Sequence, residues 1–463
     1  MSRGSAKARP QQLVDHALET STADQCVVIV EESTSANLRW ANNTLTTNGV
    51  MRSVEVTVIA FVGRANASVS GTAASLEQVT ALVQRADHAA TLAAPAEDRA
   101  DLLTGDAARD WDDAPGETSI GVFDQFAARL GEAFGQAEGR QQVFYGFVFH
   151  EVTTTYLGTS TGLRLRHVQP TGHYGATAKN AALTNSAWVG GATRDFSDVD
   201  AGQVTDELVT RLGWGERRLD LPPGRYDTVL PPTAVSDLMI DAYWNFGARS
   251  AADGQTVLSR LGGGTRVGET VTAPGVRLWS DPSYPGLECL PFVAAAGSSG
   301  ESSVYDNGLP LGPTDWISDG LLTSLVHTRR TAAELQAPIT PAIDNVVLDV
   351  AGGAGSAIDL AAQMDDGLLL TCLWYIRTVD PQTLLLTGLT RDGVYRVEGG
   401  EITGAVNNFR FNESPVDLLK RFTHAGETVP SFSREWGEDM FSRTATPALR
   451  VPDFNMSSVS QAL

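Results

Sequence analysis

The sequence predicts an α+β fold, with an N-terminal α/β-type domain followed by a C-terminal domain dominated by antiparallel β-sheet. Two patterns predict it. In the first half of the chain, segments with apolar residues at helical spacing alternate with segments rich in β-branched residues. In the second half, short strand-like segments are separated by turn residues. A chain of 463 residues is longer than a single hydrophobic core usually accommodates. We therefore expect two domains, residues 1–220 and 221–463.

The N-terminal half is expected to place helices beside a sheet. Ser75 is followed three residues later by Gln78, which is the spacing of a capping box and predicts the start of a helix. A proline and glycine cluster at 221–232 marks the expected domain boundary. The elements expected before it are a helix at 13–18, strands at 26–31 and 52–63, the helix after Ser75, an acidic loop at 92–117, a helix at 122–134, a hairpin at 143–167 and a helix at 204–212.

Residues 231–261, near the middle of the chain, predict a buried helix. Thr233 can cap its start, and Gly247 can end it. Its apolar residues recur at the spacing of one helix face, which we expect to pack on the C-terminal sheet; they are Val235, Leu238, Met239, Ala242, Tyr243 and Phe246.

Beyond this helix the chain is expected to be mostly sheet. Turn pairs at Asp392-Gly393 and Gly399-Gly400 predict an antiparallel meander. Two helices are expected after Ser356 and Ser414, which stand at capping positions. The expected strands are 275–279, 345–350, 368–379, 383–389 and 394–397.

The composition excludes several classes of partner. Lys and Arg number 34 against 55 Asp and Glu, so the net charge is −21. A surface this acidic repels phosphate backbones and anionic lipid headgroups, so we expect neither nucleic acid nor a membrane as partner. The three cysteines are far apart and odd in number, which favours a reducing compartment and buried, inert thiols. No apolar run of about 18 residues occurs, and the expected location is cytoplasmic.

The catalytic motifs that occur in the sequence are incomplete. After His150-Glu151, the second histidine of a zinc-binding HExxH helix would have to stand at Thr154, or one residue later at Thr155. Residues 158–162 match GxSxG, but a strand-like segment follows where the nucleophile elbow needs a helix, so we expect Ser160 in a hairpin turn. The glycine-rich segments 262–264 and 352–356 lack the endings of phosphate loops and are expected to be turns.

One weaker metal candidate stays open. His167 and His173 are six residues apart across Pro170 and Gly172, which predicts a loop between them. Together with a carboxylate they would form an unusual ligand set. The residues alone therefore predict a two-domain α+β protein without a recognisable catalytic set.

The sequence resembles the TldD/PmbA family of metallopeptidase-related proteins along nearly its whole length. The segments that carry the resemblance are 223–231 (PGRYDTVLP), the central helix, 255–268 (QTVLSRLGGGTRVG), 304–314 (VYDNGLPLGPT), 365–419 and 446–458 (TPALRVPDFNMSS). In this family the TldD-type subunit is a zinc peptidase with HExxxH on its central helix and a cysteine ligand near the C-terminus. The TldE/PmbA-type subunit lacks these ligands, and the two subunits enclose a chamber in which unfolded peptides are cleaved.

The resemblance implies a degenerate metal helix in this chain. An approximate alignment places Met239 and Ile240 at the His-Glu positions and Trp244 at the second histidine, and no cysteine follows Cys372. None of these side chains ligates zinc, so no catalytic residue and no cofactor are expected here, and zinc is expected only in the partner subunit.

Three functions follow as hypotheses. The first is a TldE-like non-catalytic subunit that pairs with a TldD-like zinc peptidase and helps to hold unfolded peptides, for example by strand addition at a sheet edge. The second is a self-sufficient hydrolase with unusual ligands such as His167 and His173. The third is a peptide-binding or assembly module without protease activity.

Overall fold

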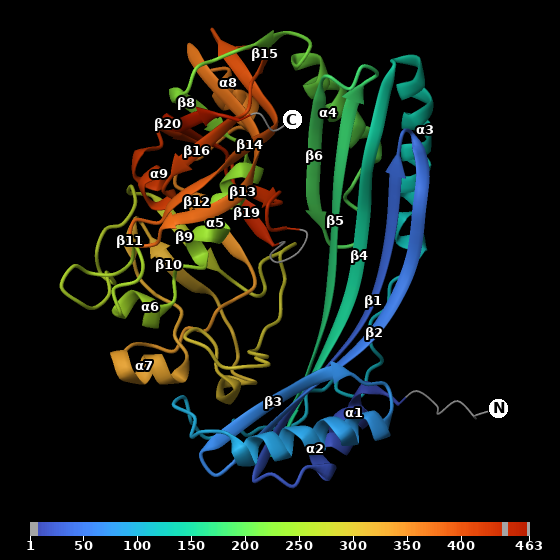
Figure 1. Cartoon of the computed structure of the whole chain (residues 1–463), viewed down its shortest axis with the longest axis vertical. Coiled ribbons are helices and arrows are strands. Elements are labelled where there is room, and N and C mark those ends of the chain that lie inside the picture. Colours follow the sequence, from blue (N-terminus) through green and yellow to red (C-terminus); the bar gives the residue numbers. More distant parts are fainter. Residues whose placement is uncertain (1–7, 438–442, 461–463) are drawn as a thin grey trace.

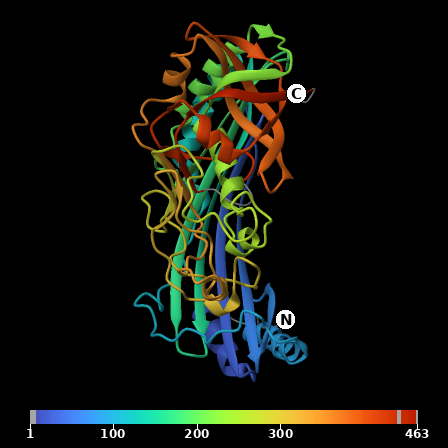
Figure 2. The ribbon, with the colours of Figure 1, turned by 90° about the vertical axis from the view of Figure 1, so that its left-hand side faces the viewer.

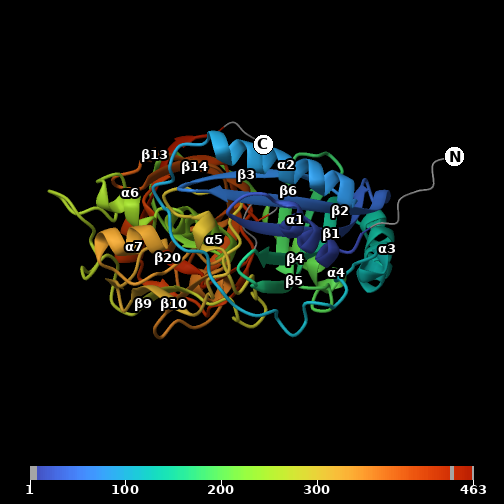
Figure 3. The ribbon, with the colours of Figure 1, turned by 90° about the horizontal axis from the view of Figure 1, so that it is seen from below.

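The structure is a computed structural model that describes residues 8–437 and 443–460. The molecule is elongated, and the long strands of an N-terminal sheet run along most of its length (Figures 1 and 2). The C-terminal half lies beside one face of this sheet, and helices α3 and α4 lie on the other side (Figure 3). The expected mixed α and β fold is confirmed.

The N-terminal sheet has six strands, and every neighbouring pair is antiparallel. The order is β3-β2-β1-β4-β5-β6. The hairpin predicted at 143–167 is β4 and β5, although both strands are longer than expected. The strands are β1 Gln25–Ala41, β2 Thr44–Val62, β3 Ala65–Thr72, β4 Gln142–Thr159, β5 Arg164–Asn180 and β6 Ser186–Thr193.

Four helices cover one face of this sheet. Ser75 caps α2 through the predicted capping box with Gln78. Alternate residues of β1 point to the same face of the sheet, and those near Val28 pack with α1 and α2, while those near Leu38 pack with α3 and α4. The helices are α1 Pro10–Thr20, α2 Leu76–Leu92, α3 Asp124–Gly139, which follows the 3-10 turn η1 Ile120–Phe123, and α4 Ala201–Trp214.

The C-terminal half contains two sheets. One has the order β11-β10-β9-β12-β19-β18. In the other, an additional pairing between β13 and β14 closes the strands β13-β8-β20-β16-β14 into a ring, from which β15 and β7 extend. The strands are β7 Arg218–Leu219, β8 Gly224–Leu230, β9 Val276–Ser280, β10 Thr314–Ser318, β11 Leu321–Leu322, β12 Val346–Val350, β13 Asp366–Asp380, β14 Leu385–Glu398, β15 Glu401–Val406, β16 Phe409–Glu413, β17 His424–Ala425, β18 Val429–Ser431, β19 Thr444–Thr446 and β20 Leu449–Val459.

The helices of this half are short and lie between or against the sheets. α5 occupies the centre of this half, between the ring of strands and the sheet that contains β9, β12 and β19. They are α5 Pro232–Tyr243, α6 Ala248–Ala252, α7 Arg329–Leu335, α8 Ala357–Ala361 and α9 Pro415–Arg421, with a 3-10 turn η2 at Val304–Asp306. In the described part of the chain, no helix is both long and apolar enough to cross a membrane.

One local prediction is wrong. Asp392-Gly393 is not a turn between two strands but an irregularity inside β14, where the two residues lie opposite the single Thr371 of β13. Asp392 and Gly393 have positive φ values of 56° and 129°. Such values are compatible with a β-bulge, in which the strand continues beyond the irregular residues. The stretch 221–232, the expected domain boundary, contains β8, which pairs with β13 and β20. The division at residue 220 remains a prediction.

Candidate functional site

The helix predicted at 231–261 is two helices with a turn between them. Gly247 precedes α6 instead of ending α5, because α5 already ends at Tyr243. The Asn245 side chain donates to the carbonyl oxygen of Asp241 (2.8 Å) and satisfies one of the end carbonyls of α5.

Thr233 does not cap α5. Its hydroxyl donates instead to the backbone oxygen of Thr371 in β13 (2.7 Å). Pro232 occupies the first helical position, where its missing N–H leaves no donor unsatisfied. The start of α5 is therefore tied directly to the ring of strands.

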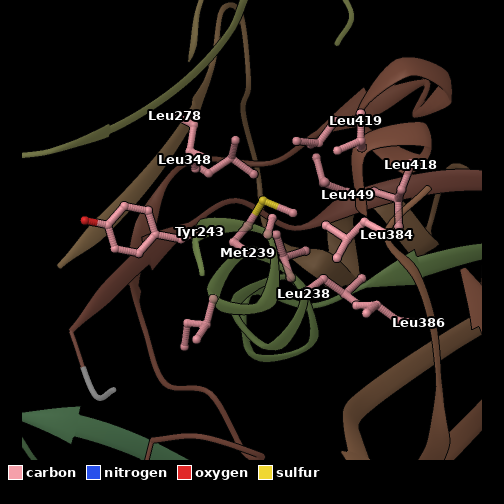
Figure 4. Packing of buried hydrophobic residues seen from close by; sticks show 14 of the residues in the cluster. Leu238, Met239, Tyr243, Leu278, Leu348, Leu384, Leu386, Leu418, Leu419 and Leu449 are labelled. Atoms are coloured by element: carbon pink, nitrogen blue, oxygen red, sulfur yellow. The ribbon is translucent and has the colours of Figure 1, made fainter. Parts of the chain in front are cut away.

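One face of α5 forms the middle of the largest apolar core. Leu238 and Met239 lie among leucines from both C-terminal sheets and from α9, while the ring of Tyr243 points to the other side (Figure 4). The predicted stripe of Val235, Leu238, Met239, Ala242, Tyr243 and Phe246 is buried throughout. The expectation that it packs α5 onto the C-terminal sheets is confirmed.

The three positions aligned with the metal motif lie in different surroundings. Met239 and Ile240 have no exposed surface and belong to the apolar core. Trp244 caps the end of α5, is 36% exposed and meets the ring of Trp436 edge-on, with centroids 4.9 Å apart. The structure does not bring these three side chains together, and their alignment with the motif remains a prediction.

Polar side chains gather on the side of α5 that faces the segment Ser431–Gly437, here called the 431–437 segment. They are Ser236, Asp237 and Asp241, all buried. Our sequence analysis missed them, although two carboxylates in an otherwise apolar helix were a usable signal. Their positions, i, i+1 and i+5, have the spacing of the His, Glu and His of HExxxH. They lie three residues before Met239, Ile240 and Trp244, the positions that the alignment above assigns to the motif.

Asp237 joins three parts of the C-terminal half. Its carboxylate accepts hydrogen bonds from the Ser433 hydroxyl (2.6 Å), the Glu435 backbone N–H (3.1 Å) and the Leu373 backbone N–H of β13 (3.1 Å). Complete burial raises the pKa of Asp237 to about 7, even though these three donors favour the ionised form. Asp237 therefore links α5, β13 and the 431–437 segment.

Asp241 lies one helical turn further along the same side. Its carboxylate accepts a hydrogen bond from the indole N–H of Trp436 (3.1 Å). Burial raises the pKa of Asp241 to about 7, and the negative charge of Glu435 adds to this effect, whereas Trp436 and the charge of Arg377 oppose it. Burial thus raises the pKa of both aspartates of α5.

Glu435 closes the open edge of β13. Its carboxylate accepts from the consecutive backbone N–H groups of Tyr375 (2.7 Å) and Ile376 (3.0 Å), and the Arg377 guanidinium lies 3.4 Å away. Tyr375 has a positive φ of 57°, which turns neighbouring N–H groups toward one acceptor. The backbone N–H groups of Leu373, Tyr375 and Ile376 therefore donate to the carboxylates of Asp237 and Glu435, and not to a neighbouring strand.

The 431–437 segment also contacts the N-terminal sheet. The ring of Phe432 stacks on His173 of β5, with centroids 5.7 Å apart. The Arg434 guanidinium lies between the rings of Trp188 of β6 (4.8 Å) and Trp374 of β13 (4.7 Å). The same seven residues therefore hold α5, β13 and the N-terminal sheet in a fixed arrangement.

Comparison with known proteins identifies this arrangement. Residues 223–458, slightly more than half of the chain, match the model of the PmbA/TldA metallopeptidase C-terminal domain. The chain belongs to the PmbA/TldD family. No curated protein matches it in sequence.

Solved structures share the fold of this PmbA/TldD protein at low sequence identity. TldE from Thermococcus kodakarensis is 15% identical, with a TM-score of 0.75 over 96% of this chain and 99% of that chain. A putative modulator of a DNA gyrase from Thermotoga maritima is 17% identical, with a TM-score of 0.74 over 96% and 99%. A putative modulator of DNA gyrase from Bacteroides thetaiotaomicron is 13% identical, with a TM-score of 0.73 over 97% and 98%.

Zinc, the metal that the family resemblance implies for the catalytic subunit, does not fit the side chains on α5. Asp237 already accepts three hydrogen bonds, and Asp241 accepts one from an indole. The Ser236 hydroxyl donates to the backbone oxygen of Pro232 (2.8 Å) and lies within 2.6 Å of the Ser431 hydroxyl. Structural zinc sites need thiolate, imidazole or free carboxylate ligands. Within residues 8–437 and 443–460, no group of three or more His, Cys, Asp or Glu is placed to hold a metal ion.

The open alternative at His167 and His173 is not supported by the geometry. Both residues lie in β5, so the predicted loop between them is wrong: Pro170 and Gly172 are part of the strand. Six residues of extended strand span about 20 Å, too far for two ligands of one metal ion. Of these two histidines, His167 lines the cavity of about 230 Å³ beside this part of β5, and His173 does not.

The remaining motif candidates are hydrogen-bonded or buried within the fold. The His150 imidazole lies within hydrogen-bond distance of the Thr118 hydroxyl (2.7 Å) and the Arg194 carbonyl (2.8 Å). Ser160 lies in the β4–β5 turn and accepts a hydrogen bond from the Cys26 N–H (3.0 Å). The three cysteines are buried, and burial raises the pKa of Cys26 and Cys289 to about 12.

Proposed function

We propose that this chain is the TldE-like, non-catalytic subunit of a TldD/TldE-type zinc metallopeptidase that processes unfolded peptides. A TldD-like relative carries the zinc and the chemistry. The observation that carries the proposal is the use of the polar side of α5: Asp237 and Asp241 are buried and hydrogen-bonded to protein groups, whereas a peptidase needs open ligands there.

The proposal includes a corrected register for the degenerate motif. Ser236, Asp237 and Asp241 have the spacing of HExxxH and converge on a segment near the C-terminus, the region from which the family's cysteine ligand comes. Met239 and Ile240 point into the apolar core, where no ligand could reach solvent or substrate. In this register each missing ligand is replaced by a hydrogen-bonded contact, with Ser433 and Trp436 as partners of the two aspartates.

The same contacts restrict where peptide is held. Strand addition requires free backbone donors, and those of Leu373, Tyr375 and Ile376 are already taken by Asp237 and Glu435. Peptide in the chamber would thus pair with another edge or with the TldD-like subunit. The role of this chain is to stabilise that subunit and to wall the chamber.

Co-expression with the TldD-like relative from the same source tests this function. We expect the two chains to copurify, and peptide cleavage to require both. The matched control is the relative with its motif glutamate replaced by glutamine, which should still copurify but not cleave. Cleavage by this chain alone, or the absence of any association, would rule the proposal out. Stable binding of peptide without any such relative would favour a peptide-binding module instead.

A further inference from the structure

One edge of the N-terminal sheet is open. β2 pairs with β1 along its whole length, but β3 pairs only with Glu55–Val62 of β2. In the part of the chain that the structure describes, Thr44–Val54 therefore has a neighbouring strand on one side only. Figure 1 shows this upper part of β2 at the outside of the molecule, beside β1.

The open segment exposes apolar side chains, and its first part, Thr44–Met51, carries no charge. Leu45, Val50 and Met51 are 50%, 58% and 67% exposed. Between Asn42 and Met51 the sequence contains neither a charged residue nor proline, in a chain of net charge −21. The first charged residue, Arg52, is already paired with Glu32 and Glu117.

The other edges of this sheet are protected. β6 is covered by the C-terminal half, because Trp188 packs on Cys372 and Phe432, and its carbonyl oxygen accepts from Arg211 (2.9 Å). β3 is short, and its first residue bridges to Pro95. Soluble proteins guard long edges with charges, proline, bulges or a cover, and an unguarded apolar edge pairs with another chain.

The open edge is also held rigid. The turn between β1 and β2 has positive φ at Asn42 (51°) and Asn43 (58°), the geometry of a tight hairpin. Asn43 exchanges hydrogen bonds with β4, accepting from the Phe144 N–H (2.7 Å) and donating to the Gln142 carbonyl (2.9 Å). A partner that pairs with β2 would therefore order little additional chain, which lowers the cost of binding.

We infer that Thr44–Val54 is the edge at which a strand of the TldD-like subunit adds to the N-terminal sheet. The inference rests on the function proposed above. A second copy of this chain is disfavoured as occupant, because it would bring two molecules of net charge −21 together. A partner chain that is less acidic would meet a weaker opposing field at this edge.

The test compares two doubly substituted proteins in binding to the TldD-like relative. Val50→Lys with Met51→Lys places charge on the open edge, and Leu92→Lys with Leu183→Lys does the same at matched exposures of 74% and 58% elsewhere. We expect the edge variant to lose at least about tenfold in affinity, equivalent to about 1.4 kcal/mol. The control should bind like the unchanged protein, and all three should unfold at the same denaturant concentration.

The outcomes separate this inference from the proposed function. Equal binding by the edge variant and the control would overturn the inference and leave the function standing. Failure of the unchanged protein to bind the relative would overturn both. If the unchanged chain associates with itself, and the edge variant loses only that association, the occupant is a second copy and the inference is wrong.

Discussion

Replacing Asp241 with asparagine is expected to raise the free energy of unfolding by up to about 4 kcal/mol at about pH 8, and by almost nothing at about pH 4. Burial raises the pKa of the Asp241 carboxyl from 3.8 to about 7 in the folded chain. Between these values the unfolded chain releases the proton while the folded chain keeps it. Stability from this group is therefore complete below about pH 4 and is lost as the pH rises to about 7.

Asparagine removes this loss because it stays neutral in both states. It also keeps an oxygen for the Trp436 indole and ends the repulsion by Glu435. Denaturant unfolding at several pH values measures the effect. Asp253→Asn is the control, since Asp253 is a 43% exposed partner of Arg249 and should change stability by less than about 1 kcal/mol at any pH. An Asp241→Asn protein with unchanged pH dependence would show that Asp241 does not titrate as described.

At about pH 4, where the raised pKa of the Asp237 carboxyl costs little stability, replacing Asp237 with alanine is expected to lower the free energy of unfolding by about 3–5 kcal/mol, because it leaves three donors without their acceptor in a buried site. The donors are the Ser433 hydroxyl and the N–H groups of Glu435 and Leu373. Near-UV circular dichroism should change as well, since the 431–437 segment positions Trp436 against Trp244 and Arg434 against Trp188.

Two further variants separate hydrogen bonding from simple loss of volume at Asp237. Asp237→Asn keeps one oxygen acceptor and should lose less stability than Asp237→Ala. Asp417→Ala, in α9, removes a 61% exposed carboxylate and should cost at most about 1 kcal/mol. If Asp237→Ala and Asp417→Ala destabilise equally, Asp237 does not link α5 to the 431–437 segment.

Much of the fold follows from local patterns in the sequence. The capping box at Ser75 and the apolar stripe from Val204 to Leu212 each predict a helix that the structure contains, because those signals depend on residues three or four apart. The apolar face of α5 is predicted for the same reason. Long strands are predicted too short, since stretches such as 46–49, which contain Thr, Asn and Gly, interrupt the apolar pattern without ending the strand.

The features that depend on distant residues could not be predicted. The bulge at Asp392-Gly393 has the composition of a turn, and only its pairing with β13 shows that the strand continues. The roles of Asp237 and Asp241 depend on Ser433, Glu435 and Trp436, almost 200 positions later in the chain. Family resemblance located the helix, but only the structure showed which of its sides faces the C-terminal segment.

A supporting subunit can keep this architecture without the chemistry, because the two sides of α5 have separate tasks. The apolar side fills the core, and the polar side holds the 431–437 segment through aspartates. That segment in turn contacts both the N-terminal sheet and β13. The proposed loss of the metal ligands is thus compatible with a buried, hydrogen-bonded centre.

The most direct test of the central claim is elemental analysis, combined with a peptide cleavage assay, on this chain alone, on its TldD-like relative alone and on the copurified pair. We predict that zinc is found with the relative and with the pair but not with this chain, and that cleavage requires the pair. One zinc ion bound per molecule of this chain, together with cleavage in the absence of the relative, would contradict the account.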